Sequence, residues 1–541
     1  MSTQPHKWEP YFPYKTPRIE QTKAIEFAIE NLVDKNKRYV IIEAGTGVGK
    51  SAIGLTAARY ITENTKSEDT ALYDSAAYYL TTQKILQEQY LKDFKSHGML
   101  SLKSSSNYRC KYFKTKTCQE SRRELKASTD ERFKANCASS CHYVVDKNKF
   151  INGYHGVTNF PYFLTEVNHS GQLPLRKIMV IDECHNIELE MSKFVEVSFT
   201  VQFAKSVLKL KVPEMSTQFK VCSWIKSVYM PKLTAVRSQM AKTLEQTGLK
   251  SRLADFVVLE RKWSMIETHW TKISRFLELY DKDNWVMNID DSRGSKGKKF
   301  EFKPIDIAPY TEEFLFKRSE KILMMSATIM NRSAFCRVLG LDESEVEFIS
   351  IPSPFDVNNR PIIATPVASL NAKNIDANLP KLAAAVSAIL EAHPNEKGII
   401  HAHSYKIANY LKDNIRTKRL LSHDSTDRDK VLARHQIDPR PTVLLSPSMS
   451  EGVDLKGDSS RFQIICKIPY PYLGDKLVKK RMNKWKWWYS LQTAKTIVQS
   501  VGRSIRNEDD HAVTYILDAG WDYFFSKNKH VFPQDFKNCI K

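Results

Sequence analysis

A glycine-rich stretch, Ala44–Ser51 (AGTGVGKS), carries the residues with the clearest chemical potential in this chain. Its glycines allow the backbone to turn several N–H groups toward a bound anion. Lys50 is then placed to reach the β- and γ-phosphates of a nucleotide, and the Ser51 hydroxyl to bind Mg²⁺. A purely structural turn is the alternative, which the Lys-Ser pair disfavours. The residues expected to contact the nucleotide here are Gly45, Thr46, Gly47, Gly49, Lys50 and Ser51.

Two adjacent acids, Asp182 and Glu183, follow the apolar run Lys177–Ile181, which is typical of a buried strand. A carboxylate at the carboxyl end of such a strand, beside a phosphate loop, can bind Mg²⁺. Glu183 would orient and deprotonate the attacking water. Paired acids after a strand are common, so the assignment depends on their pairing with Lys50.

Four of the nine cysteines, Cys110, Cys118, Cys137 and Cys141, lie close together in a basic, aromatic-rich segment. In a reducing compartment such clustering indicates metal rather than disulfides. Their intervening counts of seven, eighteen and three suit either an iron–sulfur cluster or a tetrahedral zinc. The alternative is a set of buried free thiols.

Four further polar positions could complete a nucleotide site. Gln21 precedes a helical pattern one element before the phosphate loop, where it could hydrogen-bond an adenine edge. Gln499, Arg503 and Arg506 lie in a helix-like run near the carboxyl terminus. The two arginines share a helix face, and their guanidinium groups could stabilise transition-state charge. A solvated basic patch is the alternative for them.

The elements that must position these residues alternate between strand and helix. Tyr39–Ile42 predicts a strand before the phosphate loop, and Ala52–Thr62 a helix after it. Further strands are predicted at 78–80, 177–181 and 322–325, and a second strand–helix series begins near Pro361. This alternation predicts the α/β class with two parallel-sheet domains.

Residues 200–305 break the alternation and are expected to be helical. From Phe256 to Leu277 apolar residues recur at alternating steps of three and four, which predicts a heptad seam. Pro231 and Gly248 bracket a helix before it, so an antiparallel helical hairpin is expected. Its tryptophans are assigned to the hairpin core rather than to a base-stacking platform.

Composition limits the class of protein. The chain has 541 residues, too many for one core. Lys and Arg number 82 against 61 acids, a net charge of +21 that favours a polyanionic partner. The sequence contains no run of eighteen apolar residues and no signal-peptide pattern, so we expect a cytoplasmic protein without membrane contact.

The order of these motifs resembles the XPD/DinG-like branch of superfamily 2, the iron–sulfur DNA helicases. The runs that carry the resemblance span nearly the whole chain: AGTGVGKS, TTQKILQEQ, the four cysteines, DECHNIE, KPIDIAPY, MMSATI, SPF, EGVDL and QSVGRSIR. The resemblance implies two RecA-like motor domains, with an iron–sulfur cluster domain and a helical arch inserted in the first. The expected ranges are 1–100, 151–199 and 306–352 for the first motor domain, 101–150 for the cluster domain, 200–305 for the arch and 353–541 for the second motor domain.

The resemblance also implies an activity, ATP-driven 5′→3′ movement on single-stranded DNA with unwinding of duplex. It implies ATP, Mg²⁺ and a [4Fe–4S] cluster as cofactors, with the four cysteines as cluster ligands. A monomer acting on single-stranded and on forked or tailed duplex DNA is expected. The positions implied to couple nucleotide state to DNA are Ser326, Thr328, Gly452 and Asp454.

Two departures from the family pattern are visible. Cys184 replaces the usual alanine after the two acids, and the cysteine spacing is compact. Two other functions remain open at this point: a translocase or remodeller that does not separate strands, and a redox-responsive DNA-binding protein switched by ATP.

Overall fold

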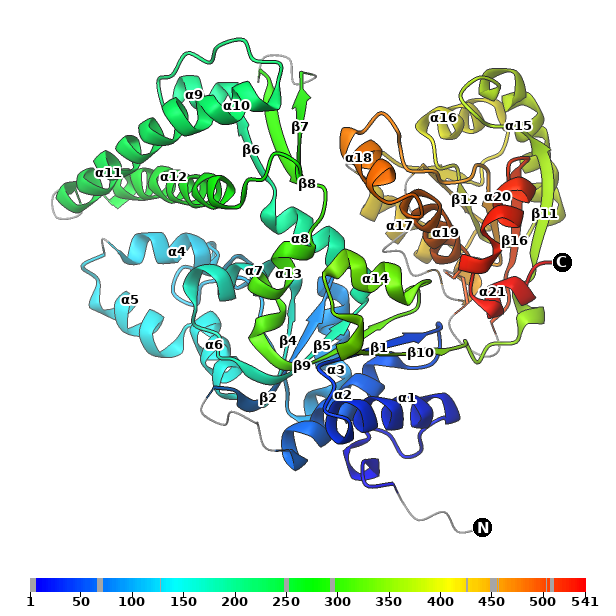
Figure 1. Ribbon diagram of the computed structural model, residues 1–541, viewed down its shortest axis with the longest axis horizontal. Helices are drawn as coiled ribbons and strands as arrows, with labels where there is room; N and C mark the ends of the chain where they lie inside the picture. Colours follow the sequence, from blue (N-terminus) through cyan, green and yellow to red (C-terminus); the bar gives the residue numbers. More distant parts are fainter. Residues whose placement is uncertain are drawn as a thin grey trace.

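Two parallel β-sheets, each with an apolar core on both faces, form most of the molecule (Figure 1). The computed structural model describes residues 6–65, 72–126, 128–247, 253–291, 297–424, 427–447, 455, 457–502, 504–505 and 510–541. The predicted α/β class with parallel sheets is therefore confirmed. The ranges predicted for the individual domains stay a prediction.

The first sheet has seven parallel strands in the order β10-β1-β9-β5-β2-β4-β3. Alternate residues of β1 enter opposite cores, Ile41 on one face and Val40 on the other, because successive strand residues point to opposite sides. Both faces are apolar, as expected where helices cover a parallel sheet. The strands are β1 (Tyr39–Ala44), β2 (Asp74–Thr81), β3 (Met99–Ser101), β4 (His155–Asn159), β5 (Arg176–Asp182), β9 (Ser319–Ser326) and β10 (Val346–Ile351).

Helices between these strands cover the first sheet. They are α1 (Ile19–Ile29), α2 (Lys50–Asn64), α3 (Lys84–Phe94), α7 (Phe160–Thr165), α8 (Ile187–Val195), α13 (Ala308–Phe314) and α14 (Arg332–Leu339). Strands β1 and β5 lie on either side of β9. The residues that follow their carboxyl ends are therefore brought to one edge of the sheet.

The second sheet has six parallel strands in the order β11-β16-β15-β12-β14-β13. These strands are β11 (Ile362–Ala368), β12 (Gly398–His401), β13 (Leu420–Ser422), β14 (Val443–Ser446), β15 (Phe462–Ile465) and β16 (Val513–Asp518). Its helices are α15 (Ile375–Ala392), α16 (Tyr405–Asn414), α17 (Arg428–Ile437), α18 (Lys476–Lys484), α19 (Trp488–Val501), α20 (Trp521–Asn528) and α21 (Gln534–Asn538).

The cysteine-bearing segment leaves the first sheet after β3 and returns at β4. It consists of α4 (Cys118–Leu125), α5 (Glu131–Ala135) and α6 (His142–Asn152). Helix α4 begins at a capping box, in which Thr117 accepts from the Glu120 N–H and Glu120 accepts from the Thr117 N–H. The insertion thus has secondary structure of its own, although few of its residues are apolar.

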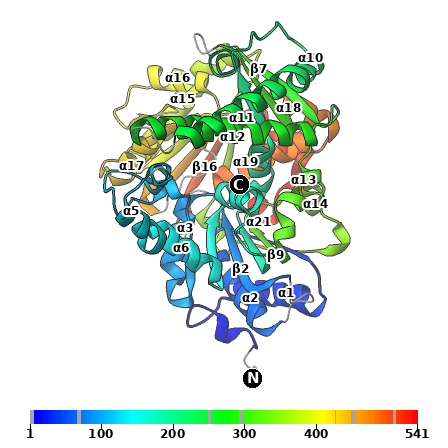
Figure 2. The same ribbon diagram turned by 90° about the vertical axis from the view of Figure 1, so that its left-hand side faces the viewer.

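Residues 200–305 hold the predicted helical hairpin. Its helices are α11 (Met230–Thr247) and α12 (Leu253–Leu279), preceded by α9 (Val201–Ser206) and α10 (Gln218–Trp224). Figure 2 shows α11 and α12 side by side. The Trp270 indole donates to the Thr234 hydroxyl at 2.9 Å, so this tryptophan packs within the hairpin as predicted. The position of Gly248 lies outside the described residues.

The expectation of helix throughout this range is wrong at its ends. Strands β6 (Val197–Thr200), β7 (Trp285–Asp290) and β8 (Lys299–Pro304) form a three-stranded antiparallel sheet at the base of the hairpin. The alternation in β8, which buries Phe300 and Phe302 but not Glu301, has the period of a strand with one covered face.

Polar contacts link the hairpin region to the cysteine-bearing segment and to the second domain. On one side Glu260 of α12 pairs with Lys126 at 2.8 Å and with Arg123 of α4 at 3.5 Å. On the other side Arg481 of α18 donates to the carbonyl of Ile305, just after β8, at 2.8 Å. Among the described residues no helix combines the length and apolar character that crossing a membrane requires.

Candidate functional site

The glycine-rich stretch forms the predicted turn between β1 and α2. Gly47 and Gly49 have φ of 91° and 85°, a left-handed conformation that favours glycine. A side chain at Gly45 would also collide with the backbone of Ser353, its Cβ lying 2.5 Å from that nitrogen. Helix α2 begins at Lys50, so its unpaired N–H groups and positive dipole end face the loop.

Gln21, which was predicted to contact an adenine edge, lies against this turn. Its Oε1 accepts from the backbone N–H of Arg18 at 2.9 Å, and a Cβ on Gly49 would lie 2.4 Å from its Nε2. The Arg18 guanidinium donates to the Gly47 carbonyl at 2.5 Å. The start of α1 is thereby fixed to the loop.

Asp182 and Glu183 occupy the carboxyl end of β5. Asp182 is buried and accepts from the Tyr90 hydroxyl at 3.0 Å and from the Glu183 N–H at 2.9 Å. Burial, with a smaller effect of the Glu183 charge, raises the pKa of Asp182 to about 6, and Lys50 opposes this rise. The structure therefore brings Lys50 and Asp182 into electrostatic range of each other.

Glu183 has φ of 54°, a left-handed value that is unfavourable for a side chain of this kind. Such strain is concentrated at functional sites. Its Oε2 lies 3.3 Å from Nδ1 of His185, which in turn lies 2.7 Å from the Ser326 hydroxyl. Cys184 is completely buried, which fits the replacement of one small residue by another.

The second sheet contributes Gln499 from α19. Its amide nitrogen donates to the Thr328 hydroxyl at 3.2 Å, across the boundary between the two sheets. Four predicted residues lie outside the described part of the chain and are not placed: Gly452, Asp454, Arg503 and Arg506.

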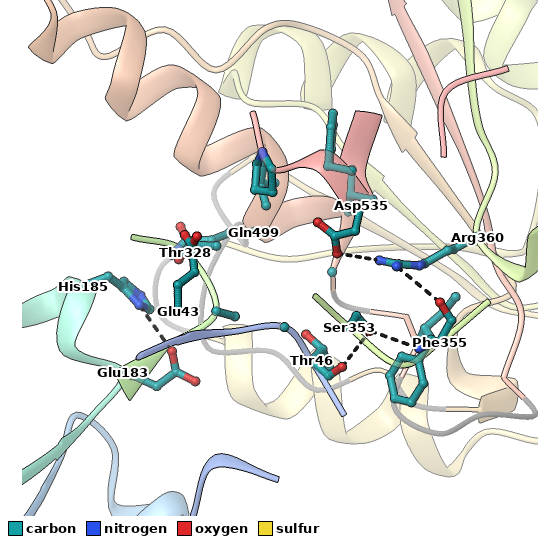
Figure 3. A pocket seen from close by; sticks show the side chains of 18 of the residues that line it. Glu43, Thr46, Glu183, His185, Thr328, Ser353, Phe355, Arg360, Gln499 and Asp535 are labelled. Carbon is teal, nitrogen blue, oxygen red and sulfur yellow. Dashed lines mark hydrogen bonds and ion pairs between the residues drawn. The ribbon is translucent and has the colours of Figure 1, made fainter. Parts of the chain in front are cut away.

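A cavity of about 1140 Å³ separates the two sheets at this point (Figure 3). Thr46 and Glu183 line it from the first sheet, and Gln499 and Asp535 from the second. Polar groups from two domains thus converge on a space of the size that holds a nucleotide-like ligand. The phosphate loop lies at its wall.

Sequence reasoning missed several residues of this cavity. Glu43, the last-but-one residue of β1, is buried and hydrogen-bonded to the turn after Thr328. Ser353 donates to the Thr46 carbonyl at 2.8 Å, and the Phe355 ring packs on Gly47. For Glu43 the sequence did contain a signal, because a single carboxylate within an otherwise apolar strand indicates a functional role. The SPF run at 353–355 was one of those that carry the resemblance, but its contacts with the phosphate loop have no local signature.

The four cysteines come together in their insertion. Cys110, Cys118 and Cys141 are buried, and the Cys118 and Cys141 sulfurs lie 3.6 Å apart. Burial raises the pKa of the Cys118 thiol to about 12, with contributions from Cys141 and Cys137. It raises that of Cys137 to about 11, with contributions from Cys141 and Cys110. The Cys118 and Cys141 sulfurs are thus in contact, and Cys110 and Cys137 lie in the same insertion.

In the described part of the chain, no three His, Cys, Asp or Glu side chains are grouped so that they could hold a metal ion. The thiols nevertheless fit a sulfur-ligated centre in donor type and in number.

Comparison with known proteins agrees with this fold and site. The family described as "Helicase C-terminal domain" matches residues 386–537, and that described as "Type III restriction enzyme, res subunit" matches residues 14–210. One match thus covers part of the first parallel sheet, and the other covers part of the second.

Two curated relatives and one solved structure define the likeness further. The chain is 23% identical to the ATP-dependent DNA helicase DinG of Photobacterium profundum, over 56% of this chain and 47% of that protein. It is 21% identical to the ATP-dependent DNA helicase YoaA of Haemophilus influenzae, over 93% of this chain and 91% of that protein. A solved structure named XPD_Helicase superposes with a TM-score of 0.63 at 18% identity, covering 96% of this chain and 99% of that one.

The match thus spans about half the length of the DinG relative. The predicted resemblance to XPD/DinG-like helicases of superfamily 2 is confirmed, and the chain has the fold of the XPD structure.

Proposed function

We propose that this protein is an ATP-dependent DNA helicase. The observation that carries the proposal is the cavity between the two sheets, where the phosphate loop, the Asp182–Glu183 pair and Gln499 meet. A site divided between two domains can convert nucleotide binding and release into relative domain movement.

In this proposal the loop, Gln21, the two acids and Gln499 act on the nucleotide from their observed places. The N–H groups of the loop and Lys50 bind the β- and γ-phosphates, and Gln21 contacts the adenine edge. Mg²⁺, held by Ser51 and Asp182, would neutralise charge that develops on the phosphates. Glu183 reaches the cavity, unlike the buried Asp182, and takes the proton of the attacking water. Gln499, Arg503 and Arg506 complete the site from the second domain.

The substrate proposed for the motor is single-stranded DNA, with movement from 5′ to 3′ and separation of forked or tailed duplexes by a monomer. The net charge of +21 supports a polyanionic partner. Ser326 and Thr328 contact the segment after Glu183 and the second-domain helix α19, which suits a role in coupling nucleotide state to DNA. Gly452 and Asp454 are proposed for the same role.

Cys110, Cys118, Cys137 and Cys141 are proposed to ligate a [4Fe–4S] cluster, which would supply folding energy to their small insertion. The shared neighbourhood of the four thiols supports this. The hairpin α11–α12 is proposed to be the arch, since Glu260 links it to the cysteine-bearing helix α4.

The test is ATP hydrolysis with and without single-stranded DNA, by the parent protein and by Glu183→Gln. The parent should hydrolyse ATP with strong stimulation by DNA, whereas Glu183→Gln should bind ATP and lose turnover, because an amide cannot take a proton. Turnover that DNA does not stimulate would support the ATP-switched DNA-binding protein instead. Parent-like turnover in Glu183→Gln would refute the assignment of the base.

A further inference from the structure

Glu43 is a buried carboxylate one residue before the phosphate-loop stretch, with 8% of its surface exposed. Its Oε1 accepts from two backbone N–H groups, those of Ile329 at 2.8 Å and Met330 at 2.6 Å. Its Oε2 accepts from the Ser350 hydroxyl of β10 at 2.9 Å. All three donors are neutral; burial raises the pKa of Glu43, and these hydrogen bonds oppose the rise. Such charge-assisted bonds are about twice as strong as neutral ones.

The backbone that Glu43 binds is a strained turn. Met330 has φ of 68°, a left-handed conformation that costs on the order of 1 kcal/mol or more for a residue with a side chain. The turn therefore needs contacts that hold it, and the two N–H groups directed at Glu43 supply them. Asn331, the next residue, begins α14 by accepting from the Ala334 N–H, which fixes the far side of the turn.

The same turn begins with Thr328, whose hydroxyl accepts from Gln499 of the second domain. The Thr328 N–H donates to the Ser326 hydroxyl at 3.1 Å, and that hydroxyl also contacts His185, close to Glu183. Figure 3 shows Glu43 beside Thr328 and Gln499 at the wall of the cavity. A single side chain on the phosphate-loop strand thus holds the turn that reaches both the second domain and the proposed base.

We propose that Glu43 is a positioning residue for ATP hydrolysis: it fixes the 328–330 turn so that Thr328 can hold Gln499 at the nucleotide. The inference rests on the proposed function and assigns a role that the sequence motifs leave open. Glu43 is not a second general base, because both of its oxygens already accept hydrogen bonds and its carboxylate is directed at the turn. Glu183, by contrast, is 30% exposed at its side chain.

The experiment compares Glu43→Ala, Glu43→Gln, Thr328→Val and the double variant Glu43→Ala/Thr328→Val. Glutamine keeps a carbonyl oxygen for the two N–H groups of the turn and should therefore rescue. The matched control is Glu190→Gln, another carboxylate with 8% exposure, which pairs with Lys193 on its own helix. The readouts are DNA-stimulated kcat and KM for ATP, binding of a fluorescent ATP analogue, and amide hydrogen exchange of the 327–331 peptide.

Glu43→Ala should lower kcat by about tenfold or more, with KM and analogue affinity within about threefold of the parent. Exchange at 327–331 should accelerate, Glu43→Gln should recover most of kcat, and Glu190→Gln should match the parent. The double variant should be no slower than the slower single variant, because both act through one contact.

Three results would each overturn the inference. They are a parent-like kcat in Glu43→Ala, losses in kcat that multiply in the double variant, and a rise in KM without a fall in kcat. If Glu43→Ala does not fold, Thr328→Val tests the same contact, and parent-like kcat there would overturn it too. A parent protein without ATP hydrolysis would refute the proposed function instead. In that case unchanged exchange at 327–331 in Glu43→Ala would still refute the hold on the turn.

Discussion

Replacing Arg481 by methionine should loosen the second domain from the first without unfolding either one. Its guanidinium, on α18, pairs with Glu188 of α8 at 2.6 Å and donates to the carbonyls of Ile305 and Pro304 at 2.8 and 3.5 Å. Both charged side chains are largely buried, with 9% and 16% exposed. Methionine keeps much of the apolar stem but none of these bonds.

The size of the effect follows from that burial. Removing one partner of a buried ion pair costs about 3–5 kcal/mol, because the other charge stays behind unpaired. Glu188 retains some access to water, so the lower end applies. A loss of about 3 kcal/mol lowers the ratio of docked to undocked molecules about 150-fold.

Single-molecule energy transfer between dyes on Lys23 of α1 and Lys412 of α16 measures this ratio, since both side chains are exposed and lie on different domains. Arg481→Met should populate a low-transfer state that the parent lacks, and Glu188→Gln should add little to it. Arg440→Met is the control, because Arg440 pairs with Asp438, two residues away in the same domain. A parent-like distribution for Arg481→Met would refute the reasoning, as would an equal change in Arg440→Met.

Three further predictions follow from other sites. Burial lowers the pKa of His155 from 6.5 to about 4, so its imidazole binds fewer protons in the native state than in the unfolded state between these values. From pH 7 to pH 5 the free energy of unfolding of the parent should therefore fall by about 2 kcal/mol more than that of His155→Asn. Urea titrations in which the variant loses as much as the parent would contradict this. Cys137→Ser should lose its iron, its visible absorption and its unwinding activity, while some DNA-stimulated ATP hydrolysis remains. The control variant Cys222→Ser should keep its iron. A colourless parent protein with one bound zinc would rule out the iron–sulfur cluster. Lys50→Ala should weaken binding of a fluorescent ATP analogue and stop ATP turnover, while its thermal unfolding stays unchanged. Parent-like turnover in this variant would refute the assignment of Lys50 to the site.

The sequence predicted those helices, strands and turns that depend on residues close together in the chain. The apolar run before Gly45 and the glycines themselves predicted a strand, a turn and a helix, and the structure has all three. The heptad spacing from Phe256 predicted α12 and its packing on α11. Strands β7 and β8 were missed although they pair with each other. Each has only six residues, and the second partner of β8 is the distant strand β6.

Contacts between distant segments could not be read from the sequence. Gln499 was predicted as a site residue, but its partner Thr328 lies 171 positions away. The hold of Glu43 on the 329–330 turn spans nearly 290 positions, and no periodicity links the two. Such pairs are set by the order of strands in the sheet, in which β1 is adjacent to β9.

Strand separation tests the central claim most directly. Duplexes with a single-stranded 5′ tail or 3′ tail are mixed with anaerobically purified protein and ATP, and the released strand is measured beside the Glu183→Gln variant. The account predicts release from the 5′-tailed duplex only, which depends on ATP hydrolysis and is absent in Glu183→Gln. DNA-stimulated ATP hydrolysis without release from either duplex would contradict it and would identify a translocase that does not unwind.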